Sequence, residues 1–282
     1  MLFQKKKGNN GRAATTNRMN INSYKPSELL RPFILTYIIV ESQYESVNRV
    51  LPDTSLVMAF RYKGRLSYTT DVVKNDLPSS SISGLRKSLR LFNYSKGTGN
   101  FLILFKETGA AAFFKNPLHT LFEESVSLDN FIPHQNLSAI EEQLAEAKSN
   151  SQRINLIEQF LLSELYNHKP DKLILTALKK IHSAKGIIKI KDLAATLYIS
   201  QDAFEKRFRR LVGTSPKQFS SILRMKSITN SRQQKHTLTK VAFDAGYFDQ
   251  PHFNKDFRLF TGQTPTEFFK FPPLLQINDF LQ

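Results

Sequence analysis

The spacing of hydrophobic residues divides the chain into a strand-like part and a helical part. Between residues 26 and 131, short runs of β-branched and aromatic residues are separated by turn residues, which is typical of an antiparallel sheet or a small barrel. From residue 136 onward, apolar residues recur at the spacing of amphipathic helices. The strand-like runs are 33–40, 56–62, 65–70, 88–92 and 101–105. The pattern predicts an α+β N-terminal domain followed by an all-α C-terminal domain.

Two short segments refine the expectation for the first domain. Lys63-Gly64 separates two strand-like runs and predicts a β-hairpin. Residues 109–114 are rich in alanine and lead into Asn116-Pro117, which favours a short helix over a strand. We therefore expect a mixed α+β domain over residues 21–132.

Two amphipathic helices are expected between the domains. Residues 136–147 and 151–166 have apolar side chains at helical spacing, within a helical linker that we place at residues 133–169. Residues 167–170 read Asn-His-Lys-Pro and form the predicted hinge. Asp171 then begins a helix that belongs to the last domain, residues 170–282.

The last domain contains a degenerate repeat, in which residues 190–219 reappear at 238–268. The segment from the matched alanine to the first phenylalanine is one residue longer in the second copy, whereas every later spacing is identical. The difference therefore lies in a turn, and the copies are predicted to be two helix-turn-helix units. The matched residues are Ala194, Phe204, Phe208, Arg209, Gly213, Pro216 and Phe219 in the first copy, and Ala242, Phe253, Phe257, Arg258, Gly262, Pro265 and Phe268 in the second.

Each copy carries the start and stop signals of its second helix. Ser200 and Asp249 are predicted N-caps, and Gly213 and Gly262 stand where a left-handed C-cap is expected. A further helix is predicted after each glycine, because a cap residue is followed by proline and, three residues after the cap, by Gln or Glu. These capping boxes span residues 215–218 and 264–267.

The helix face opposite the phenylalanines is the candidate DNA-binding surface. At 100° per residue, polar side chains gather there in both copies. For one helix alone, such a face is more often merely solvated, but duplication with matched caps favours the functional interpretation. The candidate residues are Asp202, Glu205, Lys206 and Arg209 in the first unit, and Gln250, Pro251, Asn254, Lys255 and Arg258 in the second.

Residues 170–269 resemble the DNA-binding domain of the AraC (AraC/XylS-type) family of bacterial transcription regulators. The likeness is carried by residues 245–257, Ala-Gly-Tyr-Phe-Asp-Gln-Pro-His-Phe-Asn-Lys-Asp-Phe, and by residues 262–268. It implies that two recognition helices enter successive major grooves on one face of the duplex, joined by a helix over residues 216–233. The base-contacting positions that it implies are Asp202, Glu205, Lys206, Gln250, Pro251, Asn254 and Lys255.

Three of these positions leave the preferred base sequence open. The carboxylate of Asp202 or Glu205 is able to accept a hydrogen bond from a cytosine amino group, whereas Pro251 can only touch a thymine methyl. The resemblance also leaves two roles open for the linker helices: they pair two subunits, or they pack on their own sheet. More loosely, residues 49–53 and 109–114 resemble a β-rich N-terminal domain that some members carry in place of a sugar-binding cupin.

The charge of the chain agrees with a polyanionic partner. The chain has 40 Lys and Arg against 24 Asp and Glu, a net charge of +16. Residues 170–282 hold 19 basic and 9 acidic residues, so this segment carries +10. Such a field attracts polyanions. Charge alone fits DNA, RNA or an anionic membrane, so the paired helix-turn-helix units decide between these partners.

Composition argues against several other classes of protein. The chain has no cysteine, and its apolar runs are shorter than the roughly 20 residues of a membrane helix. Residues 1–20 are a basic tail without a signal-peptide core, and both Met1 and Met19 are open as the start. The six histidines lack ligand-like spacing, and Gly97-x-Gly99 lacks the rest of a nucleotide-binding loop. We therefore expect no catalytic residue, no metal and no cofactor.

The sequence thus predicts a cytoplasmic transcription regulator that binds double-stranded DNA. RNA polymerase, a small-molecule effector at the N-terminal domain and a second copy of the chain are the further partners considered, and a membrane is not. The alternative is a small-molecule-binding or catalytic barrel that the helical domain tethers to DNA. The operator, the effector and the choice between activation and repression are left open.

Overall fold

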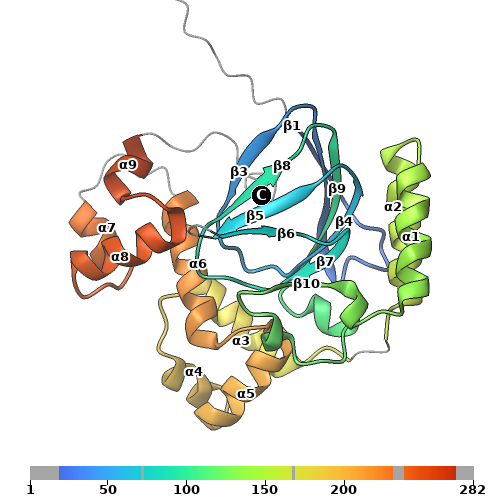
Figure 1. The fold of residues 1–282 in the computed structure, drawn as a ribbon. Helices are drawn as coiled ribbons and strands as arrows, with labels where there is room; N and C mark the ends of the chain where they lie inside the picture. Colours follow the sequence, from blue (N-terminus) through green and yellow to red (C-terminus); the bar gives the residue numbers. More distant parts are fainter. Residues whose placement is uncertain (1–18, 71–72, 167–168, 231–237, 271–282) are drawn as a thin grey trace, which may run out of the picture.

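A computed structural model of the chain describes residues 19–70, 73–166, 169–230 and 238–270. The N-terminal part is built mainly of strands, and the C-terminal part is helical (Figure 1). The predicted fold class is therefore confirmed. Parts of the predicted tail, hinge and connecting helix, at residues 1–18, 167–168 and 231–233, lie outside the described residues.

Two antiparallel sheets form the N-terminal domain. The larger has the strand order β1-β2-β9-β4-β7-β10, and the smaller has the order β3-β8-β5-β6. Strand β1 begins at Met19, inside the range expected for the tail. The strands are β1 (Met19–Tyr24), β2 (Ile34–Ser42), β3 (Ser46–Val50), β4 (Val57–Lys63), β5 (Leu66–Thr70), β6 (Val73–Asp76), β7 (Ser80–Ser83), β8 (Arg90–Tyr94), β9 (Thr98–Phe105) and β10 (Ser125–Ser127).

The predicted hairpin at Lys63-Gly64 is wrong. Strand β4 pairs with β7 and β9, whereas β5 pairs with β6 and β8 in the other sheet. The turn instead leads the chain from one sheet to the other. Gly64 adopts a φ of 74°, and a Cβ at this position would lie 2.6 Å from Thr98 Cα, so the close approach of two backbones requires glycine here.

The central strand β9 is buried along its whole length because both faces of the larger sheet are covered. Phe101, Ile103 and Phe105 point into the main core, which continues into the helices. Leu102 and Leu104 point the other way, into a smaller core with residues of both sheets. Burial on both faces explains why this segment reads as a continuous apolar run rather than an alternating one.

The linker helices α1 (His134–Glu146) and α2 (Asn150–Ser163) pack on the sheet of their own chain. The rings of Phe60 and Phe160 lie 5.5 Å apart, edge to face. Glu158 of α2 accepts hydrogen bonds from the Tyr37 hydroxyl at 3.2 Å and from the Ser27 N–H at 2.7 Å. The sequence left two roles open for α1 and α2, pairing of subunits or packing on their own sheet. In this structure, contacts with the sheet occupy the apolar faces of both helices.

Short 3₁₀ helices connect the strands to the helical part. The alanine-rich segment forms η1 (Gly109–Ala112), as the composition predicts, and is followed by η2 (Leu118–Leu121) and η3 (Leu128–Asn130). In the part of the chain that the structure describes, no helix is both long and apolar enough to cross a membrane.

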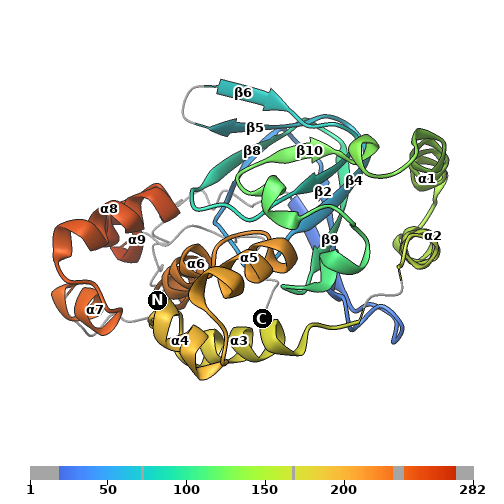
Figure 2. The ribbon, with the colours of Figure 1, turned by 90° about the horizontal axis from the view of Figure 1, so that it is seen from below.

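In the described residues 169–230 and 238–270, seven helices form the C-terminal domain, which lies against one side of the sheets (Figure 2). The first unit comprises α4 and α5, and the second comprises α7 and α8. Helix α6 runs between the units and lies next to the N-terminal domain. The helices are α3 (Lys172–Ser183), α4 (Ile190–Thr196), α5 (Gln201–Val212), α6 (Pro216–Asn230), α7 (Leu238–Asp244), α8 (Gln250–Thr261) and α9 (Pro265–Lys270).

Candidate nucleic-acid interface

The first recognition helix, α5, begins and ends where its sequence predicts. Ser200 Oγ accepts a hydrogen bond from the Ala203 N–H at 3.3 Å. Gly213 adopts a left-handed φ of 92°, and its N–H donates to the Arg209 carbonyl at 3.1 Å. Phe204 and Phe208 are fully buried, so the opposite side of the helix faces outward.

The second recognition helix, α8, repeats this construction. The Asp249 carboxylate accepts from the His252 N–H at 2.8 Å, and Gly262 ends the helix at a φ of 73°. Phe253 and Phe257 are fully buried. Both helices have 12 residues, so the two units present recognition helices of equal length.

The helices that follow start at the predicted capping boxes. The Thr264 N–H donates to Glu267 Oε2 at 2.9 Å, and the Glu267 N–H donates to Thr264 Oγ1 at 3.3 Å. These contacts hold the pKa of Glu267 below its ordinary value. In the first unit, the Gln218 N–H donates to Ser215 Oγ at 3.1 Å.

The one-residue difference between the copies lies in the turn before the recognition helix. The Ile199 N–H donates to the Ala194 carbonyl at 3.3 Å, and the Tyr247 N–H donates to the Ala242 carbonyl at 3.0 Å, so Ile199 and Tyr247 are equivalent. The N-cap follows directly in the first unit, whereas Phe248 intervenes in the second. Phe248 is 99% exposed, which places an aromatic ring outside the core beside the start of α8.

In the first unit, the predicted residues occupy the outward side of α5. Asp202, Lys206 and Arg209 are exposed, and Glu205 is half-buried. Glu205 Oε2 lies 3.7 Å from Arg209 Nη2, so this carboxylate offsets part of the charge of the arginine. Lys206 is thus the cation of this set that carries no recorded ion pair within the described residues.

In the second unit, three of the predicted residues are exposed: Pro251, Lys255 and Arg258. Gln250 is half-buried, and its Oε1 accepts from Thr239 Oγ1 at 3.2 Å. Asn254 is also half-buried, and its buried Oδ1 has no hydrogen-bond partner among the described residues. A bidentate contact of Asn254 with adenine therefore requires its side chain to turn outward.

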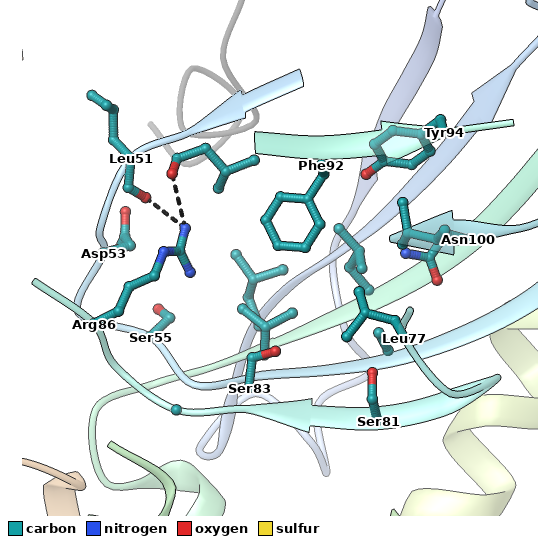
Figure 3. Close-up of a pocket in the computed structure, with 17 residues that line it drawn as sticks. Leu51, Asp53, Ser55, Leu77, Ser81, Ser83, Arg86, Phe92, Tyr94 and Asn100 are labelled. Atoms are coloured by element: carbon teal, nitrogen blue, oxygen red, sulfur yellow. Dashed lines mark hydrogen bonds between the residues drawn. The ribbon is translucent and has the colours of Figure 1, made fainter. Parts of the chain in front are cut away.

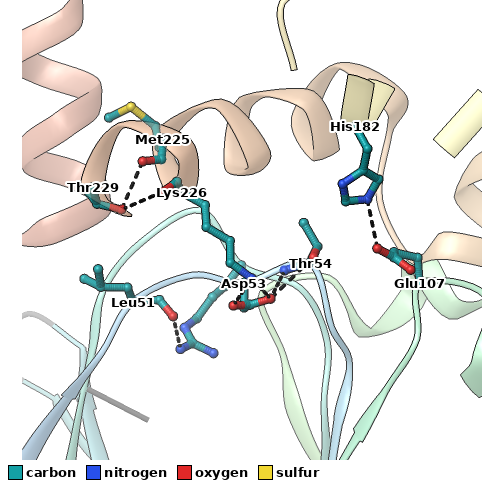
Figure 4. A network of polar contacts seen from close by, with 9 residues as sticks. Leu51, Asp53, Thr54, Glu107, His182, Met225, Lys226 and Thr229 are labelled. Atoms are coloured by element: carbon teal, nitrogen blue, oxygen red, sulfur yellow. Dashed lines mark hydrogen bonds and ion pairs between the residues drawn. The ribbon is translucent and has the colours of Figure 1, made fainter. Parts of the chain in front are cut away.

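Contacts between the two domains were not predicted from the sequence. Lys226 Nζ of α6 lies 2.8 Å from Asp53 Oδ2, in the loop between β3 and β4 (Figure 4). The partners of the hydrogen bond between Lys226 and Asp53 are 173 positions apart in the chain, and a surface lysine and a loop aspartate carry no signal of their pairing. The contact joins the N-terminal domain to the helix between the two units.

A second polar contact between the domains involves Glu107 and His182. Glu107 Oε1 lies 2.9 Å from His182 Nε2 of α3 (Figure 4). Burial raises the pKa of Glu107, but the hydrogen bond with His182 and a contact with the backbone outweigh it, so the pKa lies below its ordinary value.

The second unit also touches the N-terminal domain. The Leu89 N–H donates to the Leu259 carbonyl of α8 at 3.3 Å, and Arg49 Nη2 donates to the Thr261 carbonyl at 3.4 Å. The N-terminal domain therefore contacts α3, α6 and the end of a recognition helix.

Two family models match separate parts of the chain. Residues 193–270 match a family model described as a helix-turn-helix domain, and residues 22–127 match one described as a domain of unknown function (DUF6597). The Msm operon regulatory protein of Streptococcus mutans is 28% identical over 154 residues, which cover 53% of this chain and 55% of that protein. The chain thus spans about half the length of this curated relative.

Two solved structures align with most of the chain at low sequence identity. ToxT from Vibrio cholerae is 10% identical, with a TM-score of 0.43, over 90% of this chain and 98% of that one. The AraC-like transcriptional activator CuxR is 12% identical, with a TM-score of 0.26, over 75% of this chain and 86% of that one.

Proposed function

We propose that this chain is a transcription regulator of the AraC type that acts in the cytoplasm and binds double-stranded DNA in a sequence-specific way. One observation carries the proposal. The recognition helices α5 and α8 are capped at equivalent positions and buried through equivalent phenylalanine pairs, while their outward sides expose Lys206 and Lys255. Two such helices on one chain suit two successive major grooves.

Distinct roles follow from the placement of the predicted residues. Lys206 and Lys255 are exposed in the middle of their helices and suit donation to guanine O6 and N7. Arg258 lies one turn later and suits a phosphate, as does Arg209 once it leaves Glu205. Phosphate contacts supply most of the affinity and make it depend on salt, whereas contacts with base edges supply the specificity.

The N-terminal domain is proposed as the regulatory part of the chain. Its loops contact α6 and α8, so a change in these loops alters how the two recognition helices are held. We propose that residues 21–132 sense a small molecule and that residues 133–169 support their sheet. RNA polymerase and a second copy of the chain are proposed as further partners, and no catalytic role is assigned.

Selection of duplexes from a random pool tests the proposed function. The full chain is expected to enrich a bipartite sequence whose two parts lie about 10 base pairs apart. The variant Lys206→Ala is expected to relax one part and Lys255→Ala the other, whereas Lys172→Ala, an exposed lysine outside both recognition helices, leaves both parts unchanged. Failure of the parent to enrich any sequence contradicts the proposal.

A further inference from the structure

A cavity lies between the two sheets of the N-terminal domain (Figure 3). Its volume is about 80 Å³, and most of its lining is apolar. Figure 3 shows Arg86 at one end, Asn100 and Tyr94 at the other, and Phe92 between them, with Leu77 toward the end that holds Asn100. The cavity is thus an apolar space with a cationic end.

Arg86 is buried, and its hydrogen-bonding capacity is only partly used. It is 8% exposed, and its Nη2 donates to the Val50 carbonyl at 3.1 Å and to the Leu51 carbonyl at 3.0 Å. Its Nε is buried and donates to no atom among the described residues. Because a buried charged group is costly unless it is paired, a guanidinium in this state favours the entry of an anion.

The charges around Arg86 leave this end of the cavity positive. Asp53 also lines the cavity, but its carboxylate is bound by Lys226 at 2.8 Å. Burial and the nearby Arg90 lower the pKa of Arg86 to about 10, against the opposing effect of Asp53 and Glu123. An anion beside Arg86 would reverse this shift, because it stabilises the charged form of the guanidinium.

We propose that the cavity binds a small aliphatic monocarboxylate, with its carboxylate on Arg86 and its hydrocarbon part against Phe92 and Leu77. Guanidinium and carboxylate groups form strong, charge-assisted hydrogen bonds. The volume of about 80 Å³ limits the ligand to a few carbon atoms, since a cavity that holds benzene measures about 150 Å³. At the opposite end, the buried Asn100 Oδ1 has no partner among the described residues and would accept a donor from a substituted ligand.

The position of the site gives the ligand a route to the helical domain. The carbonyls that accept hydrogen bonds from Arg86 belong to Val50 and Leu51. Asp53, two residues after Leu51, binds Lys226 of α6. A regulatory role for the ligand rests on the proposed function. Binding of the carboxylate to the cavity does not depend on that function, and it is measured without DNA.

Isothermal titration of the full chain with butyrate and with butyramide tests the proposal. The two probes match in shape but differ in charge, so butyrate is expected to bind with 1:1 stoichiometry and at least about tenfold more tightly, a difference of about 1.4 kcal/mol. Equal affinities, or no binding of butyrate, overturn the proposal. Neither result affects the test of DNA binding.

Two variants locate the site. Arg86→Met is expected to abolish binding of butyrate. Arg153→Met is the matched control, because Arg153 also donates from Nη2 to a main-chain carbonyl and has a buried Nε without a partner, but does not line the cavity. Unchanged binding by Arg86→Met overturns the proposal.

A third variant covers the case in which Arg86→Met does not fold. Ala59→Leu keeps Arg86 and fills the cavity, since Ala59 lines it from β4. Loss of butyrate binding with a cooperative melting transition supports the proposal, and full binding by Ala59→Leu overturns it. If neither Arg86→Met nor Ala59→Leu folds, the comparison of butyrate with butyramide on the parent chain still tests the proposal, because equal affinities would overturn it.

Discussion

Lys226 Nζ and Asp53 Oδ2 lie 2.8 Å apart and join the helix between the two helix-turn-helix units to a loop of the β-rich domain. The side chains are only 24% and 13% exposed, so solvent screens the pair less than it screens a surface ion pair. Asp53 also accepts from the Thr54 N–H at 2.6 Å, which orients its carboxylate. This contact links the N-terminal domain directly to the helical C-terminal domain.

Lys226→Met is expected to destabilise the folded chain by about 1–3 kcal/mol, because it leaves a mostly buried carboxylate without its cation. The measurement is chemical unfolding, with Lys217→Met as the control, since Lys217 is exposed in the first turn of the same helix. A double-mutant cycle with Asp53→Asn isolates the pair. A coupling energy near zero contradicts the assigned contact.

Phe204→Ala and Phe257→Ala are each expected to cost about 3–5 kcal/mol, because truncating a fully buried phenylalanine leaves a cavity. Phe248→Ala is the matched control. That ring is 99% exposed, so the substitution is expected to change stability by less than about 0.5 kcal/mol. Thermal unfolding compares the three, and similar melting temperatures for all would show that the phenylalanine faces are not packed as described.

Lys255→Ala is expected to weaken binding to the selected DNA by about 1–3 kcal/mol and to relax one base position. Arg258→Ala is expected to weaken all sequences alike and to reduce the slope of log affinity against log salt by about one. Titrations of labelled duplexes at several salt concentrations separate these effects. Identical behaviour of the two variants argues against distinct roles for the two positions.

The contact between Glu107 and His182 is expected to make stability depend on acidic pH. A carboxyl whose pKa is lowered on folding stabilises the native state above its unfolded pKa, and the effect is lost as the pH falls through the native pKa. The advantage of the parent over Glu107→Gln is therefore expected above about pH 4.5 and to disappear below it. Urea unfolding across the acidic range measures it, and an advantage that grows as the pH falls contradicts this prediction.

The helical domain was predictable from sequence because its signals are local. Ser200, Gly213, Asp249 and Gly262 cap helices within four residues of themselves, and the phenylalanines repeat at helical spacing. The exposure of Lys206 and Lys255 follows directly from that periodicity. Their contact with bases remains a prediction.

The sheet topology and the buried polar contacts were less accessible from sequence. Gly64 carries the same residue signal whether its turn closes a hairpin or leads to another sheet, so the strand partners decide the outcome. Arg86 lies in an ordinary polar stretch, and only the packing of both sheets buries it. Asn254 was expected at the surface, but it is half-buried and its Oδ1 is covered, which depends on packing around α8 rather than on helical spacing alone.

The spacing of the two half-sites tests the central claim most directly. A duplex carrying the selected sequence is compared with one in which about five base pairs, half a helical turn, separate its two parts further. If α5 and α8 read one face of the DNA together, the insertion abolishes specific binding. An insertion of about ten base pairs returns the two parts to the same face of the duplex, but it places them farther apart than a single chain can span. Specific binding that is insensitive to the five-base-pair insertion would contradict the account, because only one unit would then be reading the sequence.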